Sequence, residues 1–373
     1  MISIFDFERK RISFANPMEV IFCREHRGIP ACFERMEKAL SKGYYLAGFL
    51  SYESGSAFEE CLSNSVSHDF PLLYMGVFRQ PKTHPHNPPL LIREGEAERS
   101  EAGGELIDPL INISLPQYYK NIDTIKYHIS VGDVYQITYC IKYNFDFNGD
   151  TYSLYKRLLK EQPVPYPAYI STEDFDILSL SPELFIKKNG ANITTKPMKG
   201  TWRRGRNFLE DILAGWKLKL DPKNRAENIM IADLLRNDLG RIGGSIKWPK
   251  IFEVARYTTL YQMTSTVTGK VKIDIPLYDI FRALFPSGSV TGAPKIRAMQ
   301  VIREIEGEER RIYTGAIGYI TPQRDLMFNV PIRTLLVRKG HGEVGIGGGI
   351  VWDSTAQDEL DECMLKARFL LPR

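Results

Sequence analysis

A series of short apolar segments, several of them joined by very short turns, is the feature that most limits how this chain folds. Asn189-Gly190 and Gln323-Arg324 are two such turns. Connections this short join antiparallel neighbours, because a parallel crossover needs about a dozen residues or more. The pattern therefore predicts antiparallel sheets in place of βαβ units. The predicted strands are Val134–Asn144, Ala168–Ser171, Ile177–Leu180, Leu184–Lys188, Ile193–Lys196, Gly315–Thr321, Leu326–Val337 and Glu343–Ile350.

The first hundred residues mix helix and strand signals and end in a loop-like stretch. Residues 33–41 have the apolar spacing of a helix, and the aromatic-rich residues 43–52 predict a strand. The stretch from about 79 to 110 is rich in proline and glutamate and carries Gly103-Gly104, which is typical of a loop. A length of 373 residues permits two domains. We nevertheless expect one large domain, in which the N-terminal α/β region 1–105 joins the region 111–373.

Composition and charge exclude several classes of protein. Hydrophobic residues make up 43% and charged residues 25% of the chain, which is typical of a globular protein. The net charge of +4, without a run of five like charges, gives little support for nucleic acid and weak support for an anionic small molecule. The sequence lacks a cleavable apolar leader and any run of about 18 apolar residues. The second of these absences leads us to expect no membrane contact. Five scattered cysteines without a C-x-x-C pair favour a reducing, cytoplasmic location.

Three helices are also predicted, over 224–239, 293–305 and 356–370. In the first, Glu227 lies only roughly 40° from the centre of the apolar face, which directs a carboxylate toward the core. In the last, Glu359, Glu362 and Lys366 fall along one edge of the apolar stripe. A carboxylate on a buried face needs a compensating cation. The pattern allows partly buried ion pairs with Arg236 or Lys366, or a Mg²⁺ ion bound by carboxylate oxygens.

Two glycine-rich stretches and one lysine are further candidates for a binding site. Residues 286–295 lead into a helix, whose free amides favour anions, although their spacing fits no nucleotide-binding loop. The glycines of 345–349 lie in a predicted strand and favour close approach of the backbone. In both stretches, ordinary turn and cap glycines are the alternative. Lys199, just before Gly200, is either a solvated turn charge or, with a neutral amine, a nucleophile.

Taken in this order, the segments resemble the chorismate-binding enzymes, a family that includes anthranilate, aminodeoxychorismate, isochorismate and salicylate synthases. The resemblance covers roughly residues 117–371. It implies an α+β fold in which two antiparallel β-sheets pack together, with helices on the outside and the site in a cleft of one large domain. The motifs that carry it are Gly132–Gln136, Ser181–Phe185, Pro197–Thr201, Ala226–Asp238, Phe285–Lys295, Tyr313–Gly318, Ile332–Thr334 and Glu359–Lys366.

The resemblance also implies a Mg²⁺ cofactor and roles for individual residues. Glu227 and Glu362 would hold the ion that binds the C1 carboxylate of chorismate, and Glu359 would reach it through water. Glu183 stands at the position of the family's general acid. The residues implied in substrate binding are Tyr313, Arg333, Lys366, Gln136, Thr201 and the amides around Gly347 and Gly348.

Two positions indicate which reaction of the family to expect. Isochorismate and salicylate synthases have a lysine base where this chain has Gln136, so water is disfavoured as the nucleophile. Anthranilate synthases have alanine where this chain has Lys199, as component I of aminodeoxychorismate synthase does. The resemblance thus implies that neutral Lys199 attacks C2 as the hydroxyl leaves C4. Ammonia then displaces the lysine, which gives 4-amino-4-deoxychorismate for 4-aminobenzoate and folate synthesis.

The expected partners are chorismate and a separate glutamine amidotransferase subunit that supplies ammonia, because the sequence shows no amidotransferase domain of its own. Two alternatives remain open. One is component I of anthranilate synthase, and the other is a non-catalytic relative that keeps the pocket. Gln262 and Asn224 stand where relatives commonly have histidine and glutamate.

Overall fold

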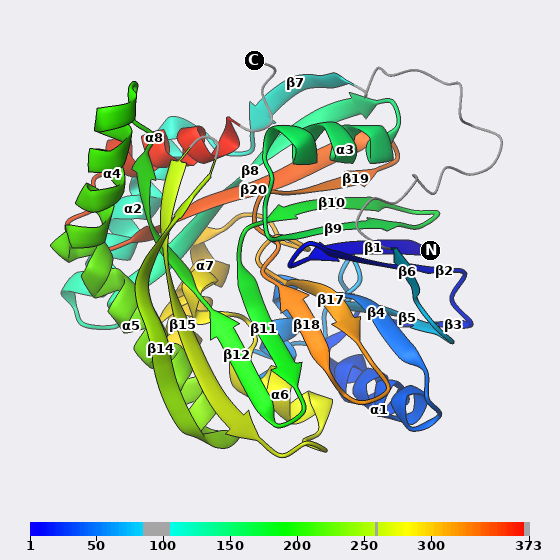
Figure 1. The fold of residues 1–373 in the computed structure, drawn as a ribbon. Coiled ribbons are helices and arrows are strands. Elements are labelled where there is room, and N and C mark those ends of the chain that lie inside the picture. Colours follow the sequence, from blue (N-terminus) through cyan, green and yellow to red (C-terminus); the bar gives the residue numbers. More distant parts are fainter. Residues whose placement is uncertain (85–104, 258–259, 369–373) are drawn as a thin grey trace.

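The computed structural model describes residues 1–84, 105–257 and 260–368, and Figure 1 shows two large sheets with helices around them. All strand pairs are antiparallel, as the short turns predict. The first sheet runs in the order β16 (Gly292–Ala293), β8 (Gln136–Asn148), β20 (His341–Ile350), β19 (Thr334–Arg338), β10 (Asp176–Ser181), β9 (Tyr166–Ser171), β1 (Ile2–Phe7), β2 (Lys10–Ala15) and β6 (Lys82–His84), with β7 (Glu105–Ile111) also on β8.

The second sheet contains all the other strands of the described residues and begins beside two long helices. Its order is β13 (Met198–Arg203), β15 (Leu260–Val271), β12 (Asn192–Lys196), β11 (Leu184–Asn189), β18 (Leu326–Asn329), β17 (Ala316–Ile320), β4 (Tyr45–Leu50), β5 (Leu73–Phe78) and β3 (Glu19–Cys23), with β14 (Gly243–Arg256) also on β15. The strands of residues 1–84 are thus divided between both sheets.

Helices cover the outer faces of the two sheets, as Figure 1 shows. The helices are α1 (Ile29–Ser41), α2 (Leu115–Ser130), α3 (Thr151–Glu161), α4 (Phe208–Leu220), α5 (Pro222–Gly240), α6 (Leu277–Leu284), α7 (Lys295–Ile305) and α8 (Ala356–Ala367), with short 3-10 segments at His26–Gly28, Tyr52–Phe58 and Gly288–Val290. Helices α1 and α6 pack on the second sheet, whereas α2, α3, α7 and α8 pack on the first. The predicted α+β fold is confirmed. No helix in the described part of the chain is long and apolar enough to cross a membrane.

Aromatic side chains fill the layer between the two sheets. Phe14 of β2 lies 5.1 Å from Phe78 of β5 between ring centroids, and Phe5 of β1 lies 5.5 Å from Tyr319 of β17. These rings belong to one buried cluster with residues from both sheets. Burial of an aromatic side chain removes roughly 150–250 Å² from water, so a few such contacts hold the sheets face to face.

One predicted strand, Leu326–Val337, is wrong as a single element. β18 ends at Asn329 in the second sheet, and β19 begins at Thr334 in the first. The chain crosses between sheets here, with Arg333 in the left-handed region at φ 51°. Apolar periodicity does not reveal this crossover, because the strands on both sides of it are buried.

A second crossover lies directly beside the first. β10 ends at Ser181 and β11 begins at Leu184, again in different sheets. The Ser181 hydroxyl donates to the carbonyl oxygen of Val330 at 2.5 Å, and the Val330 amide donates to the carbonyl oxygen of Glu183 at 3.1 Å. The two crossovers therefore support each other.

Other boundaries differ from the predictions by a few residues. Helix α7 begins at Lys295, because Gly292–Ala293 pair with the start of β8 as β16. Helix α8 ends at Ala367, and the predicted residues 369–370 lie outside the described residues. The predicted loop 79–110 has strands β6 and β7 at its ends, and residues 85–104 lie outside the described residues. The pattern did not predict α2, α3, α4 or α6, nor the long hairpin of β14 and β15.

The glycines of β20 let neighbouring groups approach its backbone closely. A Cβ atom on Gly345 would lie 2.1 Å from Cγ of the buried Tyr313 ring, and one on Gly347 would lie 2.4 Å from the carbonyl oxygen of Tyr139. Both separations are shorter than any van der Waals contact. The sequence-based interpretation of these glycines as close-approach positions agrees with this geometry.

We expect Gly345→Ala to lower the free energy of unfolding by about 1–3 kcal/mol, because the rigid Tyr313 ring must move out of a packed site. Urea unfolding of both proteins measures the difference. Gly244→Ala in β14 is the control, since its Cβ would meet nothing within 4 Å. It should leave stability unchanged or raise it by up to about 1 kcal/mol. Equal losses for the two variants would contradict the packing argument.

Candidate active site

A cavity of about 240 Å³ lies beside the two crossovers. Its walls come from β13, α5, β15, β20 and α8, with the segments around Glu183, Ser289 and Arg333. Every predicted site residue except Gln136 lines this cavity. Those residues are Glu183, Lys199, Thr201, Glu227, Tyr313, Arg333, Gly347, Gly348, Glu359, Glu362 and Lys366.

Lys199 reaches the cavity because of a bulge in β13. The pairing of β13 with β15 shifts register between Met198 and Thr201, and Gly200 lies at φ 95°. A Cβ on Gly200 would also come within 2.9 Å of the side-chain oxygen of Asn224. The predicted turn before Gly200 is therefore a bulge inside a strand. Such bulges re-aim a side chain, here that of Lys199 toward the cavity.

The Lys199 amine has neither a hydrogen bond nor an ion pair within the described residues. Burial lowers its pKa, and the nearby charge of Glu227 opposes that shift only in part. The amine lies against β20, since a Cβ on Gly349 would be 3.0 Å from Lys199 Nζ. A lysine in such surroundings keeps a larger neutral fraction than one in water, and only the neutral amine is a nucleophile.

Glu183 is 2% exposed and lies in the crossover between β10 and β11. Ser289 donates its hydroxyl to Glu183 Oε1 at 2.6 Å, and the Met198 amide approaches the same oxygen at 3.4 Å. Burial raises the pKa of Glu183 to about 7, while the Ser289 hydrogen bond and Lys199 act in the opposite direction. Much of this carboxyl group is therefore protonated near neutral pH, as a general acid requires.

Ser289 is a site residue that the sequence did not point out. Its segment was interpreted as a possible anion site at the start of a helix, but Lys295 of that helix pairs with Asp238 at 2.6 Å. The segment instead supplies the hydroxyl that orients Glu183. The only available signal was its place within the motif Phe285–Lys295.

Three acidic side chains line the opposite side of the cavity and differ in their partners. Glu362 pairs with Lys366 at 2.9 Å, which lowers the pKa of Glu362. Glu359 is buried and accepts a hydrogen bond of 2.6 Å from the Ser354 hydroxyl. Glu227 is half-buried and has no hydrogen bond or ion pair within the described part of the chain. Burial raises the pKa of Glu227 and of Glu359, and the charge of Glu362 adds to both shifts.

The ion-pair hypothesis for these carboxylates is therefore right for Glu362 and wrong for Glu227. Arg236 pairs with Asp233 at 2.7 Å on the surface and forms no ion pair with Glu227. Among residues 1–84, 105–257 and 260–368, no three His, Cys, Asp or Glu side chains are close enough together to enclose a metal. The chemistry of these side chains still suits a hard cation. Glu227 is a carboxylate without an ion-pair partner among the described residues, and the negative charge of Glu362 raises its pKa.

Arg333 supplies an unpaired positive charge on another wall. It is 7% exposed and donates to the side-chain oxygen of Gln262 at 3.3 Å. Its Nη1 atom is buried and has no hydrogen-bond partner among the described residues. Burial lowers the pKa of Arg333 to about 10, so the group stays charged at neutral pH. A buried guanidinium without an acidic partner is a natural site for a ligand carboxylate.

Gln136 is the one predicted residue that does not line this cavity. It is fully buried in β8, and its amide would be 2.1 Å from a Cβ on Gly349. Neither polar atom of that amide has a partner among the described residues. The same Cβ would lie 3.0 Å from Lys199 Nζ, so the Gln136 amide and the Lys199 amine lie close together on the same side of Gly349.

Comparisons with known proteins bear on the family and the fold of this chain. Residues 22–372 match the family model described as chorismate binding enzyme. The chain is 37% identical to aminodeoxychorismate synthase component 1 of Klebsiella aerogenes, over 70% of this chain and 58% of that protein. It is 38% identical to the protein of that name from Bacillus subtilis, over 66% and 53% of the two chains. Anthranilate synthase component 1 of Lactococcus lactis is 35% identical, over 75% and 62%. The chain thus matches less than two thirds of the length of these relatives.

Solved structures show the same fold over nearly the whole chain. Anthranilate synthase component I from Streptococcus pneumoniae has a TM-score of 0.79 at 25% identity, over 99% of this chain and 90% of that one. The menaquinone-specific isochorismate synthase of Escherichia coli has a TM-score of 0.76 at 15% identity, over 100% and 88%. The latter likeness concerns the fold alone. With a family model that spans most of its length and a cavity built from the family's motifs, this chain belongs to the chorismate binding enzymes.

Proposed function

We propose that this chain is component I of an aminodeoxychorismate synthase, which converts chorismate and ammonia to 4-amino-4-deoxychorismate and water. The observation that carries the proposal is the Lys199 amine, which lies unpaired in the cavity that Glu183 also lines. The pKa of the lysine is lowered and that of the glutamate is raised, so each is shifted toward the form that the reaction needs. Relatives at 37% and 38% identity carry this name.

Chorismate has two carboxylates, and we expect each of them to bind a different set of groups in the cavity. Arg333 would bind one carboxylate through its free guanidinium nitrogen, with Tyr313 and Thr201 beside it. Mg²⁺ held by Glu227 and Glu362, with Glu359 through water, would bind the C1 carboxylate and neutralise its charge. The ammonium group of Lys366, which now donates to the carbonyl oxygen of Gly347 at 2.8 Å, would face the same end of the substrate.

The proposed reaction has two displacements. In the first, the Lys199 amine bonds to C2, the ring double bonds shift, and the C4–O bond breaks as Glu183 gives its proton to the departing hydroxyl. In the second, ammonia bonds to C4, the double bonds shift back, and the C2–N bond to Lys199 breaks. The ammonia nitrogen returns one proton to the Glu183 carboxylate and the lysine leaves as a neutral amine. Chorismate and ammonia thus yield the product and one water, and both side chains return to their starting forms.

Lys199 also separates this proposal from the anthranilate synthase alternative. Direct attack of ammonia at C2 needs no lysine in the cavity, and an amine at this place would obstruct it. Water is disfavoured as the nucleophile, since Gln136 has no basic group to activate it. A non-catalytic role does not account for a nucleophile and an acid whose pKa values are both shifted toward the reactive form.

The proposal includes a second subunit as a partner of this chain and a reducing compartment as its location. The relatives are called component 1, and a glutamine amidotransferase is the class of partner that would supply ammonia for such an enzyme. The five cysteines of this chain are all free thiols, which fits the reducing cytoplasm.

Lys199→Ala should abolish the covalent adduct and most of the amination, because ammonia then has no activated ring carbon to attack. Mass spectrometry of the protein and of the products, after mixing with chorismate, ammonium and Mg²⁺, measures both effects. Lys196→Ala is the control, as its side chain pairs with Glu253 at 3.4 Å outside the cavity. Full-rate 4-amino-4-deoxychorismate formation by Lys199→Ala contradicts the mechanism. Anthranilate and pyruvate from the unaltered protein would contradict the proposed function.

The rate should fall as pH rises through about 7, because Glu183 then loses the proton that it must donate. Glu183→Gln should lower the rate by roughly 10²–10⁴-fold and remove this limb of the pH profile. Ser289→Ala should move the limb to higher pH, since the Ser289 hydroxyl stabilises the ionised carboxylate. If Glu183→Gln keeps the same fall in rate above pH 7, a group other than Glu183 causes that fall.

Glu227→Gln should raise the Mg²⁺ concentration needed for half-maximal rate by roughly tenfold or more, because it removes a charged ligand. Titration of turnover with Mg²⁺, and calorimetry of Mg²⁺ binding, measure the change. Asp233→Asn on the outer side of the same helix is the matched control and should behave like the unaltered protein. Equal Mg²⁺ dependence of the two variants would show that Glu227 is not a ligand.

A further inference from the structure

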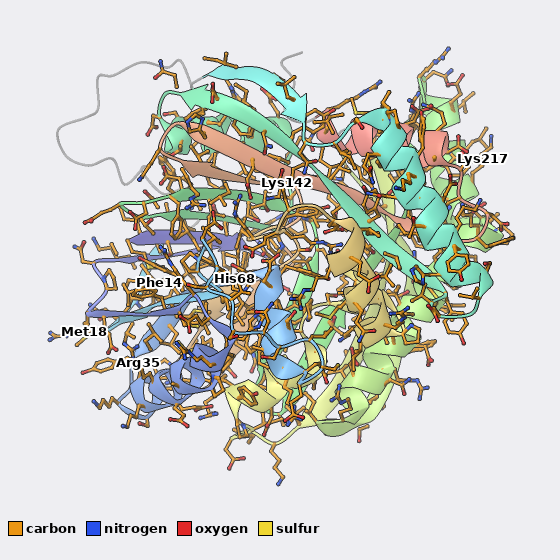
Figure 2. All side chains as sticks on the ribbon, turned by 180° about the vertical axis from the view of Figure 1, so that it is seen from behind. Phe14, Met18, Arg35, His68, Lys142 and Lys217 are labelled. Carbon is orange, nitrogen blue, oxygen red and sulfur yellow. The ribbon has the colours of Figure 1, made fainter. Side chains whose placement is uncertain are left out.

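Helix α4 presents a row of large apolar side chains to solvent on the outside of the molecule. Figure 1 shows this helix at the edge of the fold, and Figure 2 shows Lys217 of the same helix at the periphery from behind. No other element among the described residues covers this face. The exposed side chains are Phe208 (76%), Leu209 (71%), Ile212 (43%), Leu213 (56%), Trp216 (56%) and Leu220 (61%).

The inner side of α4 is already fully used by the fold. Ala214 and Leu218 are buried against Phe252 and Met263 of the hairpin of β14 and β15. The Asp211 carboxylate on the same side is bound by Arg204 at 2.6 Å. The exposed apolar residues are therefore not the side of the helix that packs on the core. They form a second stripe on the opposite side of the helix.

The second stripe has the spacing of a helix-pairing seam. Leu209, Leu213, Trp216 and Leu220 are separated by four, three and four residues. At about 100° per residue they fall within roughly 60° of one another. Apolar residues at alternating steps of three and four are what two helices use to pack along their length.

The exposed area is also large for a free surface. One aromatic side chain carries roughly 150–250 Å². Two aromatic and four aliphatic side chains, each 43–76% exposed, therefore give an apolar patch on the order of several hundred Å². The largest apolar patch on a monomeric protein is typically about 300–600 Å² and is often a site of interaction. A partner surface over α4 would remove this area from water.

The charges beside the stripe favour a second copy of the same chain as that partner. Glu210 lies in the N-terminal half of α4 and Lys217 in the C-terminal half, on the same flank of the stripe and about 20° apart around the axis. When two copies of α4 run antiparallel, this flank of one helix meets the same flank of the other. Each Glu210 then lies close to Lys217 of the other copy, which gives two equivalent ion pairs about a two-fold axis. Neither side chain has an ion pair among the described residues of one chain.

We propose that the protein forms a homodimer through antiparallel packing of two copies of α4. The contact would lie one layer away from the cavity, because α4 packs on β13 and α5, which carry Lys199 and Glu227. The dimer rests on the apolar stripe and its charges alone, and it holds whichever reaction the cavity performs.

The mass of the full chain in solution tests the proposal, measured by sedimentation equilibrium over a range of concentrations. We expect the mass to rise with concentration toward twice 42.7 kDa. Leu213→Glu should stay at 42.7 kDa under the same conditions, because it places a charge in the centre of the seam. Ile273→Glu is the matched control: Ile273 is also exposed (61%) but lies in the turn after β15, and this variant should still dimerise. Circular dichroism should show that both variants melt like the unaltered protein.

Exchange of the two charges distinguishes self-pairing from any other partner. Glu210→Lys and Lys217→Glu, each alone, should weaken dimerisation by roughly three- to tenfold, since both ion pairs become like-charge contacts. The double variant Glu210→Lys/Lys217→Glu should recover it, because both pairs form again with reversed signs. A monomer at all concentrations, a dimer that survives Leu213→Glu, or a double variant without recovery overturns the proposal. So does a monomer that binds an amidotransferase through α4.

Discussion

The contact between two neighbouring crossovers is the constraint on which the rest of the site depends. Near Ser181 and near Val330 the chain passes from one sheet to the other, and the two passages are joined by hydrogen bonds of 2.5 and 3.1 Å. The aromatic layer between the sheets holds their faces together, but this junction fixes where Glu183 and Arg333 lie. Both residues lie in irregular backbone that connects the two sheets, and this backbone places their side chains at the cavity.

The cavity has opposite effects on its acid and its base. Burial raises the pKa of Glu183 to about 7 and lowers the pKa of Lys199, so neither group needs a special partner to hold its neutral form. Ser289 and Glu227 oppose these shifts and limit them. The balance is suited to proton donation and nucleophilic attack near neutral pH. Ser289 thus acts on the pKa of Glu183, and Glu227 on the pKa of Lys199, in addition to the other contacts of each residue.

Several regular elements followed from the sequence, and two of the features that it missed have related causes. The hairpin turn at Asn189-Gly190 and helices α5 and α8 were predicted because their signals are local. The break between β18 and β19 was missed, since both strands are apolar and neither half shows which sheet it joins. Helix α4 was missed for a related reason: its buried side is narrow and its outer side is apolar, so the usual contrast between a polar and an apolar face is absent.

The sequence by itself determined the antiparallel fold class and the family motifs, because these depend on local pattern and residue type. The resemblance carried by those motifs implied eleven of the residues that line the cavity. Only the tertiary structure decided that Glu227 lacks an ion-pair partner among the described residues, that Ser289 orients Glu183 and that the Gln136 amide lies close to the Lys199 amine. Each of these facts joins residues more than thirty positions apart or depends on which neighbour is missing. Desolvation likewise arises only when distant segments exclude water together. The shifted pKa values of Lys199 and Glu183 are therefore properties of the packed molecule, which no motif contains.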